Sequence, residues 1–112
     1  MIKTKRIYEP ASPDDGKRVL VMRYWPRGVS KGRIDLWLKE LSPRPELLRE
    51  WREGKLTWDE FSSRYRAEVG REHELMRSLH AEASVSDVTL LCGCLNENRC
   101  HRGVLKGLIE AL

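Results

Sequence analysis

Two continuous apolar runs stand out in a chain whose other apolar residues are mostly spaced apart. The first run covers residues 18–22, where Val19–Met22 follow Arg18, and the second covers residues 88–92, with Thr89 as its one polar residue. A short apolar run bounded by polar residues is typical of a strand that is buried on both faces of a sheet. Residues 2–8 instead alternate between charged and apolar side chains, as expected for an exposed edge strand. The pattern therefore predicts two central strands and one edge strand.

The connection between the first two predicted strands is short and carries turn residues. The segment from Ser12 to Gly16 combines Pro, two Asp and Gly, which together favour a tight bend. A crossover between parallel strands normally takes a dozen or more residues. We expect a mostly parallel sheet. Because this link is shorter than a usual crossover, an antiparallel edge strand at residues 2–8 stays open as an alternative.

Apolar residues recur at helical spacing in the rest of the chain. Four such segments separate the two apolar runs, and a fifth follows the second run. They cover residues 34–41, 47–51, 58–69, 75–79 and 99–112.

Capping residues indicate where several of these helices begin. Thr57 and Glu60 have the spacing of a capping box, in which each side chain accepts a hydrogen bond from a backbone amide of the first turn. Ser30 and Asn98 are expected to cap the first and the last of the five helices.

Aromatic residues on the apolar helix stripes supply much of the expected core. Trp37, Trp58, Phe61 and Tyr65 are each predicted to be buried. A chain of 112 residues is too short to bury two separate cores. We therefore predict a single domain over residues 1–112, with a three-layer α/β fold in which helices flank a small, mostly parallel sheet.

Composition places the protein inside the cell. A membrane-spanning helix needs about 20 apolar residues, and no apolar run approaches that length. The first residues lack the apolar segment of a secretory signal, and three cysteines make an odd number, which favours reduced thiols over a disulfide framework. We therefore expect a cytoplasmic protein with no membrane partner. The absence of Gln and the presence of only two Asn indicate a source that grows at high temperature.

The first loop with chemical interest follows the first apolar run and covers residues 23–33. It holds four cations and two glycines in eleven residues. Arginine side chains match the geometry of carboxylate and phosphate groups, and glycine lets backbone amides approach an anion. Arg23, Arg27 and Ser30 are therefore candidate anion-binding residues. The alternative is a solvated charged loop in which Trp25 packs into the core.

The second loop covers residues 92–102, follows the second apolar run and contains all three thiols. Cys100 is expected in the first turn of the last helix, where the helix dipole and the neighbouring cations favour its thiolate. We therefore predict that Cys100 is the most reactive thiol, ahead of Cys94 and then Cys92. His101 lies near the centre of the apolar face of that helix, where it is either a catalytic partner or an ordinary core histidine. Arg102 is a further candidate anion-binding residue.

More specific motifs fail in this second loop. A tyrosine-phosphatase loop needs an arginine six residues after its cysteine, but Cys100 and Asn98 occupy those positions after Cys94 and Cys92. Three thiols and the imidazole of His101 are zinc-ligand types, but Cys-x-Cys replaces the usual Cys-x-x-Cys. No metal and no cofactor are therefore assigned from the sequence, and the metal or redox module stays an alternative.

Several motifs resemble those of the YeaO-like family, also called domain of unknown function 488. The resemblance covers nearly the whole chain. It rests on the segments Ser12–Gly16, Val19–Val21, Arg23–Lys31, Leu36–Lys39 and Val88–Leu91, and on Phe61 with Tyr65. The broader family often ends its last strand with a cysteine and then reaches a Cys-His-Arg triplet, which matches Cys92 and residues 100–102 here. Cys94 stands where an acidic residue is common. The resemblance implies a three-layer α/β fold and implies no particular activity.

These observations lead to one main functional hypothesis and two alternatives, which are a nucleic-acid-binding module and the metal or redox module described above. The main hypothesis is a protein that binds a small anionic or phosphorylated ligand at the carboxyl edge of the sheet, where open α/β folds bind their ligands. Arg23, Arg27, Ser30 and Arg102 would hold the anion, and Cys100 with His101 would supply catalytic groups. A nucleic-acid-binding module is less favoured, because the aromatic residues have core spacing. The oligomeric state and the occurrence of catalysis stay open.

Overall fold

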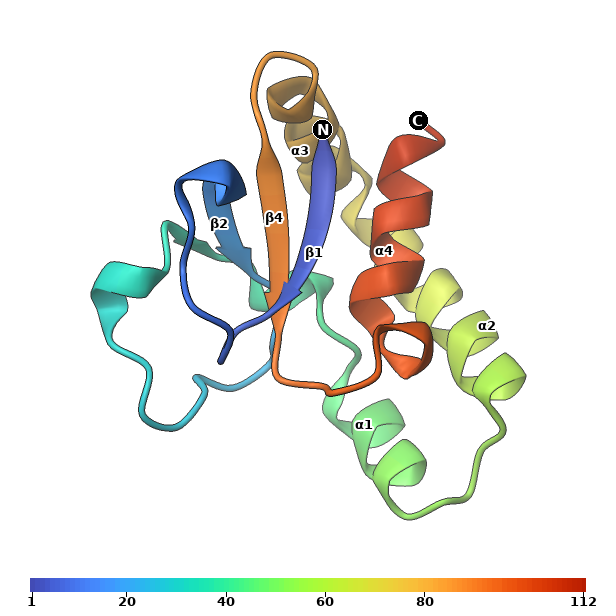
Figure 1. Ribbon diagram of the computed structural model, residues 1–112. Coiled ribbons are helices and arrows are strands. Elements are labelled where there is room, and N and C mark those ends of the chain that lie inside the picture. Colours follow the sequence, from blue (N-terminus) through green and yellow to red (C-terminus); the bar gives the residue numbers. More distant parts are fainter.

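Four parallel strands form one sheet in the computed structural model, which covers residues 1–112 (Figure 1). The order of the strands across the sheet is β1-β4-β2-β3. Their bounds are Ile2–Arg6 for β1, Lys17–Leu20 for β2, Leu36–Trp37 for β3 and Val88–Cys92 for β4. Thus β1 lies at an edge, and the two apolar runs supply the central strands β2 and β4, as predicted.

The alternative of an antiparallel edge strand is wrong, because every neighbouring pair in the sheet is parallel. The short link between β1 and β2 had suggested it. These two strands are not neighbours, since β4 lies between them. Residues 7–16 can span up to about 33 Å, which exceeds the roughly 17 Å length of a five-residue strand. The link therefore returns along the sheet through a turn at residues 7–8 and a 3-10 turn at Pro13–Asp15, and it needs no α-helix.

Four α-helices contribute to the main hydrophobic core, on one face of the sheet. They are α1 (Pro45–Arg52), α2 (Trp58–Val69), α3 (His73–Ala83) and α4 (His101–Glu110). Alternate strand residues such as Val19 and Leu90 point into this core, together with side chains from all four helices. The other face carries a small cluster of Ile7, Leu20, Val29 and Leu91, which loop residues rather than helices cover. The α/β fold class is confirmed, with loop chain in place of helices on this second face.

The helix expected over residues 34–41 does not form. The segment holds strand β3 between two 3-10 turns, at Lys31–Arg33 and Lys39–Leu41. The open edge of β2 has backbone groups that need partners, and residues 35–38 supply them. Ser30 forms no side-chain cap. The burial predicted for Trp37 is also wrong, since this residue is 37% exposed and its Nε1 donates to the carbonyl of Met22.

The capping box at the start of α2 is confirmed. Thr57 Oγ1 accepts a hydrogen bond from the amide of Glu60 at 3.1 Å, and the Glu60 carboxylate accepts one from the amide of Thr57 at 2.9 Å. Phe61 and Tyr65 are buried in the next turns, while Trp58 is only half-buried. The start of α2 is therefore held by its own sequence as well as by packing.

No helix of the protein has the length and apolar character needed to cross a membrane.

A buried ion pair secures the turn that leads into β2. The carboxylate of Asp15 pairs with the guanidinium of Arg18 and lies 3.0 Å from Lys5 Nζ, and it also accepts a hydrogen bond from the amide of Ser12. Gly16 follows with a φ of 62°, and a Cβ there would lie 2.1 Å from the carbonyl oxygen of Asp87. Only glycine fits this contact between the turn and the start of β4.

Candidate functional site

A cavity of about 390 Å³ opens at the carboxyl edge of the sheet. Because the strands are parallel, the segments that follow β1, β2 and β4 all reach this edge. The end of α1 and the start of α4 complete the wall. The cavity is lined by Tyr8, Met22, Arg23, Tyr24, Trp25, Ser42, Leu48, Arg52, Cys92, Gly93, Cys94 and His101. The two loops singled out in the sequence therefore meet in one place.

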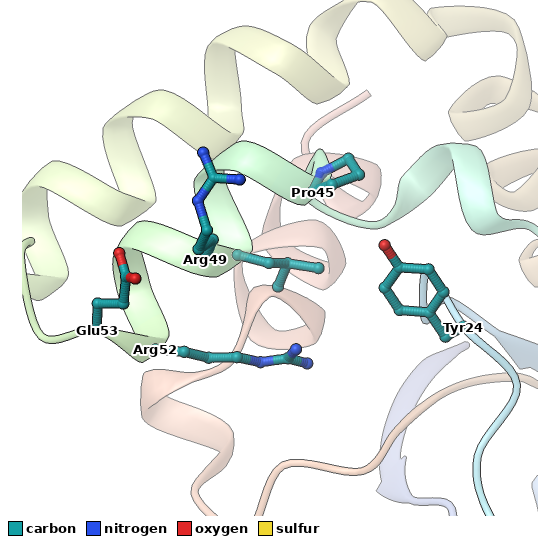
Figure 2. A pocket seen from close by; sticks show the side chains of 6 residues that line it. Tyr24, Pro45, Arg49, Arg52 and Glu53 are labelled. Carbon is teal, nitrogen blue, oxygen red and sulfur yellow. The ribbon is translucent and has the colours of Figure 1, made fainter.

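A second cavity of about 340 Å³ adjoins the first along α1 (Figure 2). The two cavities share Tyr24, Leu48 and Arg52. In Figure 2 the Arg52 side chain extends from α1 toward the Tyr24 ring, while the side chains of Arg49 and Glu53 point away from that ring. Arg52 thus belongs to both cavities and faces the larger one.

Positive charge dominates the lining of the larger cavity, which includes Arg23 and Arg52 and no carboxylate. Arg23 is held in place by the carbonyls of Ser42 and Pro43, at 3.1 and 3.3 Å from its Nη2. Its Nη1 makes no hydrogen bond within the protein. Arg52 forms no ion pair. The lining can therefore offer two guanidinium groups to a ligand.

The other predicted anion-binding residues lie elsewhere. Arg27 and Ser30 are exposed on the loop and do not line the cavity. Arg102 is buried, and its Nη1 donates to the carbonyl of Cys94 at 2.9 Å and to the sulfur of Cys100 at 3.5 Å. The Arg102 guanidinium thus contacts the thiol loop instead of the cavity.

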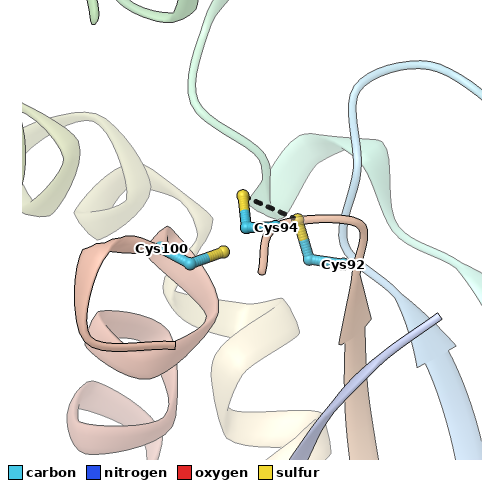
Figure 3. A group of neighbouring side chains, drawn as sticks. All are labelled: Cys92, Cys94 and Cys100. Carbon is cyan, nitrogen blue, oxygen red and sulfur yellow. Dashed lines mark hydrogen bonds between the residues drawn. The ribbon is translucent and has the colours of Figure 1, made fainter. Parts of the chain in front are cut away.

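The three thiols converge beside the cavity (Figure 3). Cys92 ends β4, Cys94 follows two residues later, and Cys100 is the residue that precedes α4. All three sulfur atoms lie within 4.8 Å of one another, and those of Cys92 and Cys94 are 3.8 Å apart. Figure 3 shows the sulfurs of Cys92 and Cys94 joined by a dashed line and the Cys100 sulfur pointing toward this pair. The return from β4 into α4 therefore gathers every thiol of the protein.

Exposure separates the three thiols. Cys94 is exposed, whereas Cys92 and Cys100 are buried, and only 2% of the surface of Cys100 is exposed. Hydrogen bonds from the thiols of Cys100 and Cys92 lower the pKa of Cys94 well below its ordinary value, while contact with Cys92 and Cys94 and burial raise the pKa of Cys100. The burial of Cys100 counts against its being the most reactive thiol and favours Cys94 instead. The helix begins at His101, so Cys100 turns its sulfur inward instead of presenting it to solvent.

His101 is buried and contacts both the segment after β2 and the loop that carries the thiols. Its Nε2 lies 2.6 Å from the carbonyl oxygen of Val21, and its ring packs edge-on against Tyr65 at 5.4 Å. Burial lowers the pKa of His101, so the ring is neutral at neutral pH. Because Nε2 donates to a carbonyl, Nδ1 carries the lone pair, and it faces the sulfur of Cys100 at 3.8 Å. The inward orientation predicted for this histidine is found.

Alkylation should follow exposure and not the order inferred from helix position. In the fully reduced protein, iodoacetamide at neutral pH is expected to modify Cys94 first and Cys92 and Cys100 much more slowly, because only the Cys94 sulfur is open to solvent. Peptide mass spectrometry over time measures the order. Faster labelling of Cys100 than of Cys94 would contradict this assignment, and labelling in urea provides the control with all three thiols accessible.

Some residues of the cavity were not singled out in the sequence. Tyr8 follows β1, Ser42 follows a 3-10 turn, and Arg52 ends α1. None belongs to a motif with its own chemistry. An arginine in the last turn of a helix is usually explained by the helix dipole, so the role of Arg52 in the cavity becomes visible only in three dimensions.

Comparison with known proteins places the chain in a family. A family profile described as "Active DUF488-N3 subclade" matches residues 2–112. Uncharacterized protein Rv3073c of Mycobacterium tuberculosis is 37% identical over 112 residues, which cover 97% of this chain and 93% of the relative. Uncharacterized protein YeaO of Escherichia coli is 34% identical over 113 residues, covering 99% and 98%. No solved structure matches the chain. The profile match and these relatives show that the chain belongs to the DUF488 family, in its YeaO-like branch.

Proposed function

We propose that the protein binds a small organic anion in the larger cavity, between Arg23 and Arg52 and next to the thiol of Cys94. The observation that carries this proposal is the charge of the lining, which contains two arginines and no carboxylate. A charge-assisted hydrogen bond from a guanidinium to carboxylate or phosphate is stronger than one between neutral groups. An anion is therefore the ligand that this lining favours.

The size and the walls of the cavity restrict the ligand further. A volume of about 390 Å³ lies within the range of small-molecule sites. Apolar and aromatic side chains form much of the wall, among them Tyr24, Trp25 and Leu48. A ligand that fills the cavity would place its anionic group between the arginines and an apolar or aromatic part against these side chains. Organic phosphates and carboxylates fit this description better than inorganic phosphate.

The thiol that such a ligand would meet is Cys94. It lines the cavity and is exposed, whereas Cys100 lies behind it. Any covalent step on the bound ligand would therefore begin at Cys94, with Cys92 the next sulfur at 3.8 Å. This replaces Cys100 as the candidate nucleophile.

The proposal predicts that Arg52→Met weakens the binding of phenyl phosphate by about 10-fold or more. Removal of one hydrogen bond to a charged group costs about 1.5–3 kcal/mol, and 1.4 kcal/mol corresponds to a factor of ten. Arg52 makes no ion pair in the protein, so its loss should leave the fold intact. Isothermal titration calorimetry measures the affinity, and Arg23→Met should have a similar effect.

Arg27→Met is the matched control, because Arg27 is an exposed cation outside the cavity. It removes the same charge and should leave the affinity unchanged. If Arg27→Met and Arg52→Met lowered the affinity for phenyl phosphate equally, the binding would be general attraction to a cationic protein. That result would refute the proposed site. Equal affinity for inorganic phosphate and phenyl phosphate would refute the role of the apolar wall.

A further inference from the structure

We propose that the three thiols form a site for a single soft metal ion of the zinc or copper(I) class, bound by Cys92, Cys94 and Cys100. This goes beyond the proposed anion binding and does not depend on it.

The sulfur atoms already have nearly the spacing of a thiolate metal site. Zinc binds thiolate sulfur at about 2.3 Å, which places two sulfurs of a tetrahedral site about 3.8 Å apart. The sulfurs of Cys92 and Cys94 are 3.8 Å apart, and all three lie within 4.8 Å of one another. Rotation of side chains can close the remaining difference, so one ion can contact all three sulfurs.

The surroundings of the sulfurs suit a metal that carries three thiolates. A divalent ion with three thiolates has one net negative charge, and the guanidinium of Arg102 lies 3.5 Å from the sulfur of Cys100. The Nε of Arg102 is buried with no partner in the protein. The same arginine holds the loop through the carbonyl of Cys94. Arg102 therefore offsets the excess charge and fixes the loop that carries the ligands.

His101 lies on a second side of the three thiols. Its Nε2 donates to the carbonyl of Val21, and its Nδ1 faces the sulfur of Cys100. In the metal-free protein the thiol of Cys100 can therefore donate a hydrogen bond to Nδ1. The thiol gives up this bond together with its proton when the sulfur binds the ion.

The choice of metal follows from the donor atoms. Thiolates favour zinc and copper(I), whereas magnesium and calcium need oxygen ligands. No carboxylate lines the adjoining cavity. Cys94 is exposed and lines that cavity, so the metal would keep one side open toward it. Three protein ligands and an open position are typical of zinc sites that bind a further small ligand.

The test is metal binding by the reduced, metal-free protein. Titration with Co²⁺ should give sulfur-to-metal charge-transfer absorption that saturates at one equivalent, and Zn²⁺ should abolish it. A parallel titration with Cu⁺ in a competing chelator distinguishes the two classes of ion. Cys94→Ser should weaken binding by more than about 100-fold, which exceeds the 10- to 100-fold effect typical of losing an outer contact. Because Cys94 is exposed, this variant should fold even if Cys100→Ser does not.

Two kinds of control complete the experiment. His73→Asn changes an exposed histidine far from the thiols in sequence and should leave the absorption unchanged. Arg52→Met should weaken the binding of phenyl phosphate and leave the metal affinity unchanged, which separates failure of this proposal from failure of the proposed function. Absence of charge-transfer absorption while all three thiols are shown to be reduced would overturn the proposal. Unchanged metal affinity in Cys94→Ser would overturn it as well.

Discussion

Replacing Phe61 by Ala is expected to lower the free energy of unfolding by about 3–5 kcal/mol, the range for removing a buried phenylalanine side chain. Phe61 is 2% exposed and lies at the centre of an aromatic group. The ring centroids of Trp51 and Trp58 are 5.0 and 5.5 Å away, and that of Tyr65 is 6.5 Å away. The cavity left behind could not close without moving these large rings. Urea denaturation followed by circular dichroism measures the loss.

Trp58→Ala serves as the comparison for this prediction. The sequence places Trp58 and Phe61 on the same stripe, but Trp58 is half-buried at the start of α2. Its replacement should therefore cost less than that of Phe61. A larger loss for Trp58→Ala than for Phe61→Ala would show that the core of the aromatic group is misassigned.

Replacing Asp15 by Asn is expected to cost about 3 kcal/mol, because removal of one partner leaves a buried charge uncompensated. The partner is Arg18, whose guanidinium is buried and donates to the Asp15 carboxylate. Chemical denaturation at neutral pH measures the loss. Asp14→Asn is the matched control, because Asp14 is the exposed acid of the same turn. This substitution should leave the free energy of unfolding nearly unchanged. Equal effects of the two substitutions would contradict the role of the buried pair.

The same carboxylate predicts how stability changes in acid. Burial raises the pKa of Asp15, but the hydrogen bond from the Ser12 amide and the contacts with Lys5 and Arg18 outweigh burial and leave it below its ordinary value. A lowered pKa in the folded state adds stability above the unfolded value of about 3.9. That contribution is lost as the pH falls through the folded pKa. The stability difference between wild type and Asp15→Asn should therefore shrink below about pH 3.9.

Much of the fold follows from patterns that are local in the sequence. The runs at 18–22 and 88–92 are continuous and apolar, so burial on both faces is their natural outcome, and the Thr57 capping box specifies the start of α2. The segment at 34–41 misleads because its apolar spacing fits a helix, while its actual structure depends on the free edge of β2. The position of β4 between β1 and β2 is a non-local property and has no local signal.

The site shows the same division between local and non-local information. The loops at 23–33 and 92–102 were correctly expected at one edge, because parallel strands bring their carboxyl ends together. The order of thiol reactivity could not be obtained in this way. It depends on the residue at which α4 begins and on which sulfur faces solvent, and a shift in the helix start reverses the expected role of Cys100. The arginine of α1 enters the cavity through tertiary packing alone.

The central position of β4 has a consequence for how a newly made chain acquires its structure. In the sheet Ile2 pairs with Val88, so β1 has no partner until residues 88–92 have been synthesised. Until then β2 can pair only with the two residues of β3. Contacts between segments so distant in sequence carry a large loop-closure cost and form slowly. β1 and one edge of β2 therefore stay without their partner strand until residues 88–92 have been made, and β4 must then insert between them.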